Sequence, residues 1–375
     1  MPVPQARSSW RHVALLLALA WLAIGLFGAY LYTHRYQLYR GFPAPVTPAG
    51  VARGSVRNEY FDSAALGGRH RYLVYLPPHY AAQAARGARF PVLYLLHGDP
   101  GSPEVFTRAG ALAVQADVLL SEHRIKPMIF VMPSGKGGLL QAGTEWANAQ
   151  SGPYESYVLD VVHDVDRRFA TVPGRQGRGI GGLSEGGFGA LNISLHHLND
   201  FSVAESWSGY FNETRTGAFS HATTAQIRAN SPAQYVATLS PEIHRLGYRA
   251  WIYQGQLDSR PESHIRNFSA ALHAAGAEVH YGFFPGGHDW GLWRAQLPRM
   301  LTAASAWFAR SPRSGTPGFS GVGHAGSAAA IRRYEIRRRE LCLRRRAARR
   351  AAGKPPGHLC QVIRPLARRH APPSG

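Results

Sequence analysis

Strand-like and helix-like segments alternate along most of this chain, and this alternation restricts the folds open to it more than any other feature. Short apolar runs rich in β-branched and aromatic residues recur, among them RYLVYLP, FPVLYLLHG, PMIFVMP and YRAWIYQG. Between them lie segments such as YESYVLDVVHDVDRRF, whose apolar residues repeat every three or four positions, as on one face of a helix. The pattern predicts an α/β fold with a mostly parallel central sheet and helices on both faces.

The N-terminal part of the chain does not share this alternation of strand-like and helix-like segments. After Arg7 and Arg11 comes an uncharged apolar run over residues 13–32, long enough to cross a hydrocarbon core of roughly 30 Å. It predicts a transmembrane signal-anchor over residues 13–33, preceded by a cytoplasmic N-terminus of residues 1–12. A cleaved signal peptide is the alternative, but the run is longer than a usual h-region and no clear A-x-A site follows it. We therefore expect a single-pass protein of the cell membrane, with its α/β domain on the extracytoplasmic side.

The next segment, residues 34–57, contains Pro43, Pro45 and Pro48 and few residues that could form a core. It reads as a linker that separates the membrane segment from the α/β domain, which we place at residues 58–310.

A basic tail over residues 311–375 follows this domain. The formal net charge of the chain is +20, and the stretch 331–375 alone holds 14 Lys or Arg against two Glu, so the α/β domain is only mildly basic. Dense like charge opposes compaction and predicts a disordered or helical tail, with attraction to anionic lipid as its functional interpretation. No nucleic-acid-binding module accompanies it, so a nucleic-acid partner is not expected. Cys342 and Cys360 both lie in this tail and could pair, stay free or link chains.

The motif with the clearest chemical meaning is Gly182-Leu183-Ser184-Glu185-Gly186, which matches G-x-S-x-G between a strand-like and a helix-like run. A serine in this context sits on a turn so sharp that neighbouring side chains would collide, hence the flanking glycines. The turn exposes the hydroxyl above the N-terminus of the next helix, which favours developing negative charge. The motif predicts Ser184 as a nucleophile.

A nucleophilic serine needs a base and an orienting acid, and the chain offers both in the order Ser, acid, His. His288 lies in a loop after a late predicted strand, in PGGHDWGLW. Asp258 follows the preceding strand in YQGQLDSRPESH and is the expected acid, with Glu262 as the alternative. The carboxylate would hold the histidine tautomer and stabilise the imidazolium without taking its proton.

An oxyanion hole requires two backbone N–H donors, one from the residue after the nucleophile and one from a loop after an early strand. Glu185 supplies the first. The loop His97-Gly98-Asp99-Pro100-Gly101 ends the most apolar predicted strand and supplies the second from Asp99. No metal or other cofactor is expected to take part.

Several blocks together resemble a known family, the esterase D group that also contains feruloyl esterases, enterochelin-esterase-like enzymes and the antigen 85 mycolyltransferases. The blocks are LLHGDPGS, EWAN, YESYVLDVVHDVDRRF, GGLSEGGFGALN, SWSGYF and HDWGLW, spread over residues 58–309. The resemblance implies an α/β-hydrolase fold, the triad Ser184, Asp258 and His288, and substrate-pocket aromatics at Trp146, Trp290 and Trp293. Glu185 departs from the family, which often has a neutral residue there, but an oxyanion hole requires only its backbone N–H.

Three functions fit these features. The first is hydrolysis of carboxylic esters through an acyl-enzyme on Ser184, with lipid or cell-envelope esters as candidate substrates because of the membrane segment. The second is acyl transfer of the mycolyltransferase type, which uses the same triad and differs in the final acceptor. The third is an inactive binding protein that keeps the fold, since a fold alone does not guarantee activity.

Overall fold

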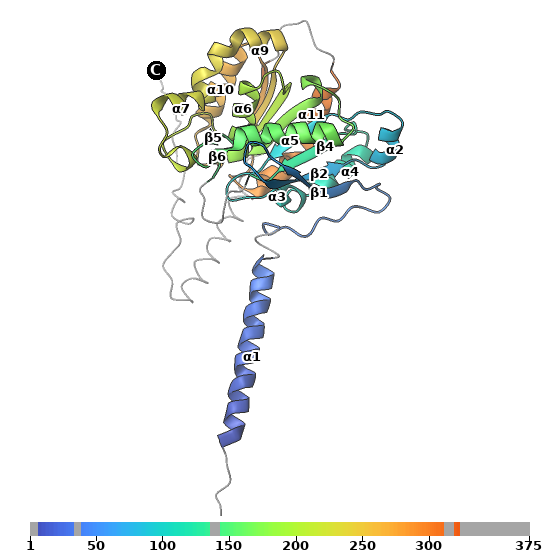
Figure 1. Ribbon diagram of the computed structural model, residues 1–375, viewed down its shortest axis with the longest axis vertical. Helices are drawn as coiled ribbons and strands as arrows, with labels where there is room; N and C mark the ends of the chain where they lie inside the picture. Colours follow the sequence, from blue (N-terminus) through green and yellow to red (C-terminus); the bar gives the residue numbers. More distant parts are fainter. Residues whose placement is uncertain (1–6, 34–38, 136–142, 311–318, 323–375) are drawn as a thin grey trace, which may run out of the picture. The chain divides into compact units, whose positions relative to one another are not determined.

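The computed structural model describes residues 7–33, 39–135, 143–310 and 319–322. They contain a long N-terminal helix and an α/β domain (Figure 1). The strands of the main sheet, in spatial order, are β1 (Ser55–Asp62), β2 (Arg69–Leu76), β4 (Ile129–Pro133), β3 (Val92–Leu96), β7 (Arg178–Leu183), β8 (Val203–Trp207), β9 (Arg249–Gly255), β10 (Glu278–Phe284) and β11 (Phe319–Val322). A separate short hairpin consists of β5 (Asn148–Ala149) and β6 (Gly152–Pro153).

The helices are α1 (Arg7–Tyr32), α2 (Tyr80–Ala85), α3 (Glu104–Thr107), α4 (Leu112–Ser121), α5 (Tyr154–Arg168), α6 (Glu185–His196), α7 (Thr224–Ala229), α8 (Pro232–Tyr235), α9 (Ser240–Leu246), α10 (Glu262–Ala274) and α11 (Trp290–Phe308). Short 3-10 turns occur at η2 (Arg175–Gly177), η3 (Gly217–Phe219) and η4 (Val236–Leu239).

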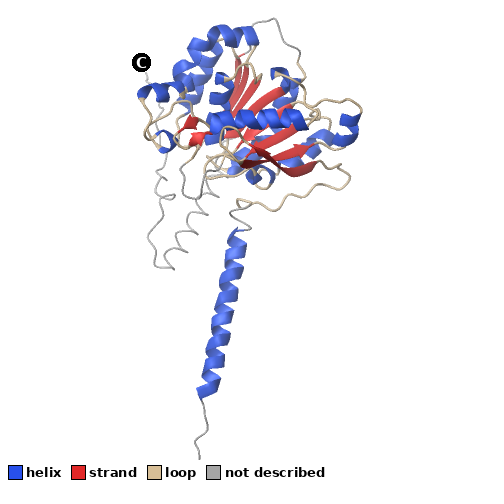
Figure 2. Cartoon of the chain, in the orientation of Figure 1, coloured by secondary structure: helices blue, strands red, loops and turns tan. Residues whose placement is uncertain are grey.

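The sheet is mostly parallel, as the alternation of strand-like and helix-like segments predicts. Strand β2 runs antiparallel to both β1 and β4, whereas every pairing from β4 across to β11 is parallel. Figure 2 shows the sheet between helices, which is the arrangement that buries both faces of a parallel sheet. The predicted α/β-hydrolase fold class is confirmed.

Two hydrophobic cores lie on opposite faces of the sheet. Alternate residues of β2 divide between them, with Tyr72 and Val74 in one core and Leu73 and Tyr75 in the other. The first core includes α5, α6 and α10, and the second includes α3, α4 and α11. Because side chains of a strand alternate between faces, this division fixes the register of the sheet.

Helix α1 contains the apolar run that the sequence singles out. From Trp10 to Tyr32 it has a mean hydropathy of 2.2 and is long enough to cross a membrane, and its apolar side chains are exposed. It begins at Arg7, six residues before the predicted span, because helical geometry continues through the preceding polar residues. It is therefore a candidate membrane or signal helix.

The segment after α1 was expected to be a linker, and its described part contacts the α/β domain at both of its ends. Arg40 donates a hydrogen bond from Nη2 to the carbonyl oxygen of Pro100 at 3.2 Å. At the other end, the Gly54 N–H donates to Oδ1 of Asp117 at 2.9 Å. Strand β1 then begins at Ser55, three residues before the predicted domain boundary.

The basic tail, apart from the four residues of β11, lies outside the described residues, as do Cys342 and Cys360.

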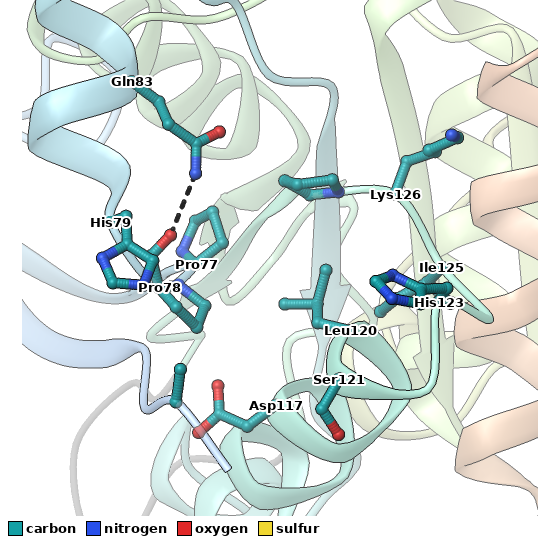
Figure 3. A pocket seen from close by; sticks show the side chains of 12 residues that line it. Pro77, Pro78, His79, Gln83, Asp117, Leu120, Ser121, His123, Ile125 and Lys126 are labelled. Carbon is teal, nitrogen blue, oxygen red and sulfur yellow. Dashed lines mark hydrogen bonds between the residues drawn. The ribbon is translucent and has the colours of Figure 1, made fainter. Parts of the chain in front are cut away.

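A cavity of about 430 Å³ lies at the amino-terminal edge of the parallel strands (Figure 3). Pro77 and Pro78 follow β2, and Ile125 and Lys126 precede β4, which places their segments at this edge. Asp117 faces the cavity and accepts hydrogen bonds from Gly54 and from the Tyr75 hydroxyl. Ligands of open α/β sheets bind outside the carboxyl ends of the strands, and this cavity lies at the opposite edge.

Candidate active site

Ser184 occupies a strained turn between β7 and α6. Its φ of 55° and ψ of −119° are rare for a residue with a side chain. A Cβ on Gly182 would lie 2.3 Å from the carbonyl oxygen of Gly186, and one on Gly186 would lie 2.0 Å from that of Leu96. Only glycine fits at either position, so the G-x-S-x-G pattern follows from the sharpness of the turn.

Three side chains from separate loops are joined at this turn. Nε2 of His288 lies 2.8 Å from Oγ of Ser184, and its Nδ1 lies 2.8 Å from Oδ2 of Asp258. Asp258 follows β9, and His288 lies between β10 and α11. Asp289 fixes the start of α11 directly after the histidine, because its side chain accepts the N–H groups of Gly291 and Leu292.

The surroundings of Asp258 keep it ionised. Its side chain is 1% exposed, against 30% for His288. Burial alone would raise the pKa of Asp258, but the hydrogen bond from His288 and the backbone N–H of Arg260 at 3.2 Å lower that pKa below its usual value. An ionised acceptor at Nδ1 favours the histidine tautomer whose Nε2 can accept the serine proton.

The alternative acid, Glu262, points elsewhere. Its carboxylate pairs with Arg266 at 2.9 Å, one turn along α10. The structure therefore brings Asp258, and not Glu262, to His288.

The two predicted oxyanion donors lie on either side of Ser184. Helix α6 begins at Glu185, and the N–H groups in the first turn of a helix have no intrahelical acceptor. Asp99 belongs to the loop after β3, which approaches so closely that a Cβ on Gly98 would lie 3.1 Å from Cβ of Ser184. The loop and the helix N-terminus thus meet at the serine.

The three predicted pocket tryptophans are buried to different extents. Trp146 is completely buried and donates from its indole N–H to the carbonyl oxygen of His97 at 2.9 Å, so its ring has no surface to offer a substrate. Trp293 lies edge-on to His288, with ring centroids 5.1 Å apart, and donates to Ser208. Trp290 is 8% exposed and packs against Trp293.

An oxyanion hole requires only the backbone N–H of Glu185, but the side chain of Glu185 also stabilises the site. Its Oε1 accepts hydrogen bonds from the Thr144 N–H at 2.8 Å, the Thr144 hydroxyl at 3.1 Å and the Glu145 N–H at 2.6 Å. Glu145 and Trp146 both have positive φ, 51° and 49°, so this carboxyl group holds a strained segment close to Ser184. Burial, then the nearby Glu145 and Asp99, raise the pKa of Glu185 to about 8.

The sequence did not predict a role for Tyr210 or Arg260, which continue the contacts of Glu145. The Tyr210 hydroxyl donates to Oε2 of Glu145, and the Arg260 guanidinium lies over the Tyr210 ring, 4.9 Å from its centroid. Since Arg260 also donates its backbone N–H to Asp258, the contacts link Glu185 to Asp258. EWAN and SWSGYF were the available signals, because the first block contains Glu145 and the second contains Tyr210, which follows the end of β8.

Comparison with known proteins fits this geometry. Residues 63–304 match the model of the family described as "Putative esterase". The chain belongs to this esterase family. The feruloyl-esterase-like resemblance expected from the sequence blocks is thereby confirmed at the level of the family.

Relatives of this esterase family share only part of their length with the chain. An esterase of Mycobacterium tuberculosis is 32% identical over 155 residues, which cover 40% of this chain and 31% of that protein. An endo-1,4-beta-xylanase/feruloyl esterase of Xylanibacter ruminicola is 28% identical over 161 residues, covering 42% and 22%. The chain thus spans about a third or less of the length of these relatives.

Solved structures match the whole domain. A ferulic acid esterase superimposes with a TM-score of 0.61 at 24% identity, covering 68% of this chain and 99% of that one. A fluorophosphonate-binding serine hydrolase of Staphylococcus aureus gives a TM-score of 0.58 at 19% identity, covering 69% and 100%. At these identities the likeness concerns the fold.

Within the described residues, no group of three or more His, Cys, Asp or Glu is arranged to hold a metal ion.

Proposed function

We propose that the chain is a serine carboxylesterase that forms an acyl-enzyme on Ser184. The observation that carries the proposal is a pair of 2.8 Å hydrogen bonds, in which Nε2 of His288 accepts from the Ser184 hydroxyl and Nδ1 donates to the carboxylate of Asp258. Membership of the esterase family supports the same reaction class.

In this mechanism His288 acts first as a general base. Its Nε2 takes the Ser184 hydroxyl proton as Oγ attacks the ester carbonyl, and the same proton passes to the leaving alkoxide when the tetrahedral intermediate collapses. Water then attacks the acyl-enzyme by the same route and releases the acid. Asp258 remains ionised throughout and stabilises the transient imidazolium.

The negative charge that develops on the carbonyl oxygen needs donors already in place. We assign this role to the backbone N–H groups of Glu185 and Asp99, which flank Ser184 on α6 and on the loop after β3. Loss of one such donor typically costs about 3 to 4 kcal/mol of transition-state stabilisation. The loop therefore contributes to the rate through its backbone N–H group, whichever side chains it has.

We further propose that α1 anchors the protein in the cell membrane and that the esterase domain lies on the extracytoplasmic side. The length and hydropathy of the helix support this assignment. Lipid or cell-envelope esters are then the natural substrates.

Substitution of Ser184 tests the reaction. Ser184→Ala should lower kcat for 4-nitrophenyl acetate by about 10⁴-fold or more, because the nucleophile is lost, and should abolish labelling by a fluorophosphonate. Ser121→Ala, at a surface serine that bonds the Val118 carbonyl, is the matched control and should retain both. Labelling at another residue, or full turnover without Ser184, would exclude the proposed mechanism.

A further inference from the structure

The described part of the segment between α1 and β1, residues 39–54, begins at the active-site edge of the sheet. Arg40 bonds the carbonyl oxygen of Pro100, in the loop that also contains Asp99. Two residues later Phe42 is half-buried against the core under α11, and the guanidinium of Arg294 lies 4.7 Å from its ring centroid. Since α11 starts two residues after His288, both contacts fall on the side of the domain that holds the triad.

The same segment ends at the opposite edge. Gly54 bonds Asp117, and a Cβ at Gly54 would lie 2.6 Å from the carbonyl oxygen of Leu76. Leu76 is the last residue of β2, which runs antiparallel to β4, so it lies at the amino-terminal edge of the parallel strands. Residues 40–54 therefore run along the domain from the active-site edge to the far edge.

This route matters because the connection to α1 is short. Eight peptide units join Tyr32, the last residue of α1, to Arg40, and a chain spans at most about 3.6 Å per residue, or about 29 Å. A domain of this size has a radius of gyration of about 18 Å and hence a diameter of roughly 45 Å. With the contacts of Arg40 and Phe42 in place, the far edge could lie closest to the end of α1 only if the connection were almost fully extended along the side of the domain.

We propose that residues 40–54 hold the active-site edge of the domain next to the membrane that α1 crosses, so that the enzyme acts on amphiphilic esters embedded in that membrane. This inference rests on the proposed function and on α1 serving as an anchor. A tether at the active-site edge gives Ser184 a high effective concentration of esters at the bilayer surface. A tether at Gly54 would turn the same serine away from them.

The position of the tether can be moved without changing its length. Deletion of residues 40–53 joins residue 39 to Gly54, so eight peptide units again separate Tyr32 from the domain, but at the far edge. The matched control keeps the native edge and inserts a Gly-Ser segment, equal in length to the deletion, between residues 38 and 39. The full-length proteins are placed in vesicles that contain a long-chain acylglycerol ester, and 4-nitrophenyl acetate is supplied in solution.

We expect the ratio of embedded-ester to soluble-ester turnover to fall more than tenfold in the deletion variant. In the insertion variant it should fall no more than about fivefold, as the effective concentration decreases with the −3/2 power of tether length. The ratio corrects for partial loss of folded enzyme, because soluble-ester turnover reports the active fraction. An unchanged ratio in the deletion variant would overturn the inference.

A second variant covers the case in which the deletion prevents folding. Phe42→Ala removes the ring that Arg294 covers and should lower the ratio severalfold with soluble-ester turnover intact. If the deletion variant is unfolded and Phe42→Ala leaves the ratio unchanged, the inference is wrong. A parent protein that hydrolyses neither ester and is not labelled at Ser184 would instead contradict the proposed function.

Discussion

Two buried carboxyl groups lie beside Ser184, and their surroundings move their pKa values in opposite directions. Asp258 reaches the serine through His288, and its pKa is lowered. Glu185 follows the serine in the chain, and its pKa is raised to about 8. Burial disfavours the charged form of both, so burial alone cannot explain the difference.

The neighbours of each carboxyl group decide the outcome. Asp258 accepts hydrogen bonds from an imidazole and from the backbone N–H of Arg260, whose guanidinium also lies 4.0 Å away. Glu185 also accepts hydrogen bonds, but the carboxyl groups of Glu145 and Asp99 lie near it and oppose its ionisation. A buried carboxyl group beside cationic partners can serve as a fixed charge, whereas one beside other acids serves near neutral pH as an uncharged hydrogen-bonding group.

The largest effect should come from Asp258→Asn. The amide can donate to Nδ1 of His288 and so favours the tautomer whose Nε2 already carries a proton and cannot accept one from Ser184. We expect kcat for a soluble ester to fall by about 10⁴-fold with little change in thermal stability. Steady-state kinetics and the rate of fluorophosphonate labelling both report it. A loss below tenfold would mean that the fixed charge is dispensable.

Glu185 should respond to shape and hydrogen bonding more than to charge. Glu185→Met leaves the two N–H groups and the hydroxyl of residues 144 and 145 without their acceptor, and we expect kcat at pH 7 to fall by about 10- to 100-fold. Glu185→Gln keeps an acceptor oxygen and should stay within about threefold of the parent. Glu122→Met, at an exposed glutamate paired with Arg124, is the control. Equal kcat in Glu185→Met and the parent would show that the side chain is not needed.

The parent and Glu185→Gln should differ in how their kcat depends on pH. Because the pKa of Glu185 is about 8, the group is mostly neutral at pH 7 and becomes negative above pH 8, beside the developing oxyanion. The parent should therefore lose kcat on the order of tenfold between pH 7 and pH 9.5, whereas Glu185→Gln should not. The acidic groups that face this site from neighbouring elements are Asp99, Glu145, Tyr154, Tyr210 and Glu213.

Among these, Glu213 is the competing source of an alkaline transition, since burial and then Glu145 raise its pKa to about 8 as well. The variant Glu213→Gln distinguishes Glu213 from Glu185 as the source of this transition. If the loss of kcat above pH 8 disappears in Glu213→Gln and persists in Glu185→Gln, the transition belongs to Glu213 and the assignment to Glu185 is wrong.

The contrast between the two carboxyl groups also shows what sequence can reveal. Ser184, Asp258 and His288 each follow a strand-like run in the order typical of the fold, so local motifs were sufficient to select the three residues that the hydrogen bonds join. The catalytic roles of these residues stay predictions. The α/β fold was predictable for the same reason, because strand and helix periodicities are local.

The partners of Glu185 were not predictable in this way. Thr144 and Glu145 lie about forty residues upstream, and the contact depends on left-handed backbone at Glu145 and Trp146, two residue types that rarely adopt it. The contact between Phe42 and Arg294 likewise joins the expected linker to the last helix of the domain. A proline-containing segment reads as a spacer because its packing surface belongs to residues far away in the sequence.

The carboxyl group of Glu155, which pairs with His196 and His197, allows the same comparison outside the candidate active site. Burial would raise the pKa of Glu155, but hydrogen bonds from His196 and His197 lower it to about 2. A lowered carboxyl pKa stabilises the fold above the unfolded value near 4.5, and this contribution is lost as pH falls toward 2. The raised pKa of His196 adds stability below about 6.5 that is lost as pH rises through the folded value.

Glu155→Gln should therefore reduce the free energy of unfolding most between about pH 4.5 and 6.5, by about 2 kcal/mol, and much less near pH 2 or pH 9. Urea unfolding of the parent and the variant across this range measures the difference. A pH-independent difference would show that Glu155 acts by packing alone, and the rule drawn from Asp258 and Glu185 would then not extend to it.

The smallest effect is expected at Glu262, which the sequence leaves open as the alternative acid. Its carboxylate pairs with Arg266 across one turn of α10, and both side chains are partly exposed, at 34% and 44%. Exposed pairs of this spacing contribute about 0.3 to 0.5 kcal/mol. Glu262→Gln should leave kcat within twofold and lower stability by no more than that amount. A loss of kcat approaching that of Asp258→Asn would mean that His288 turns to Glu262 during turnover, and the contrast between a charged Asp258 and a neutral Glu185 would lose its basis.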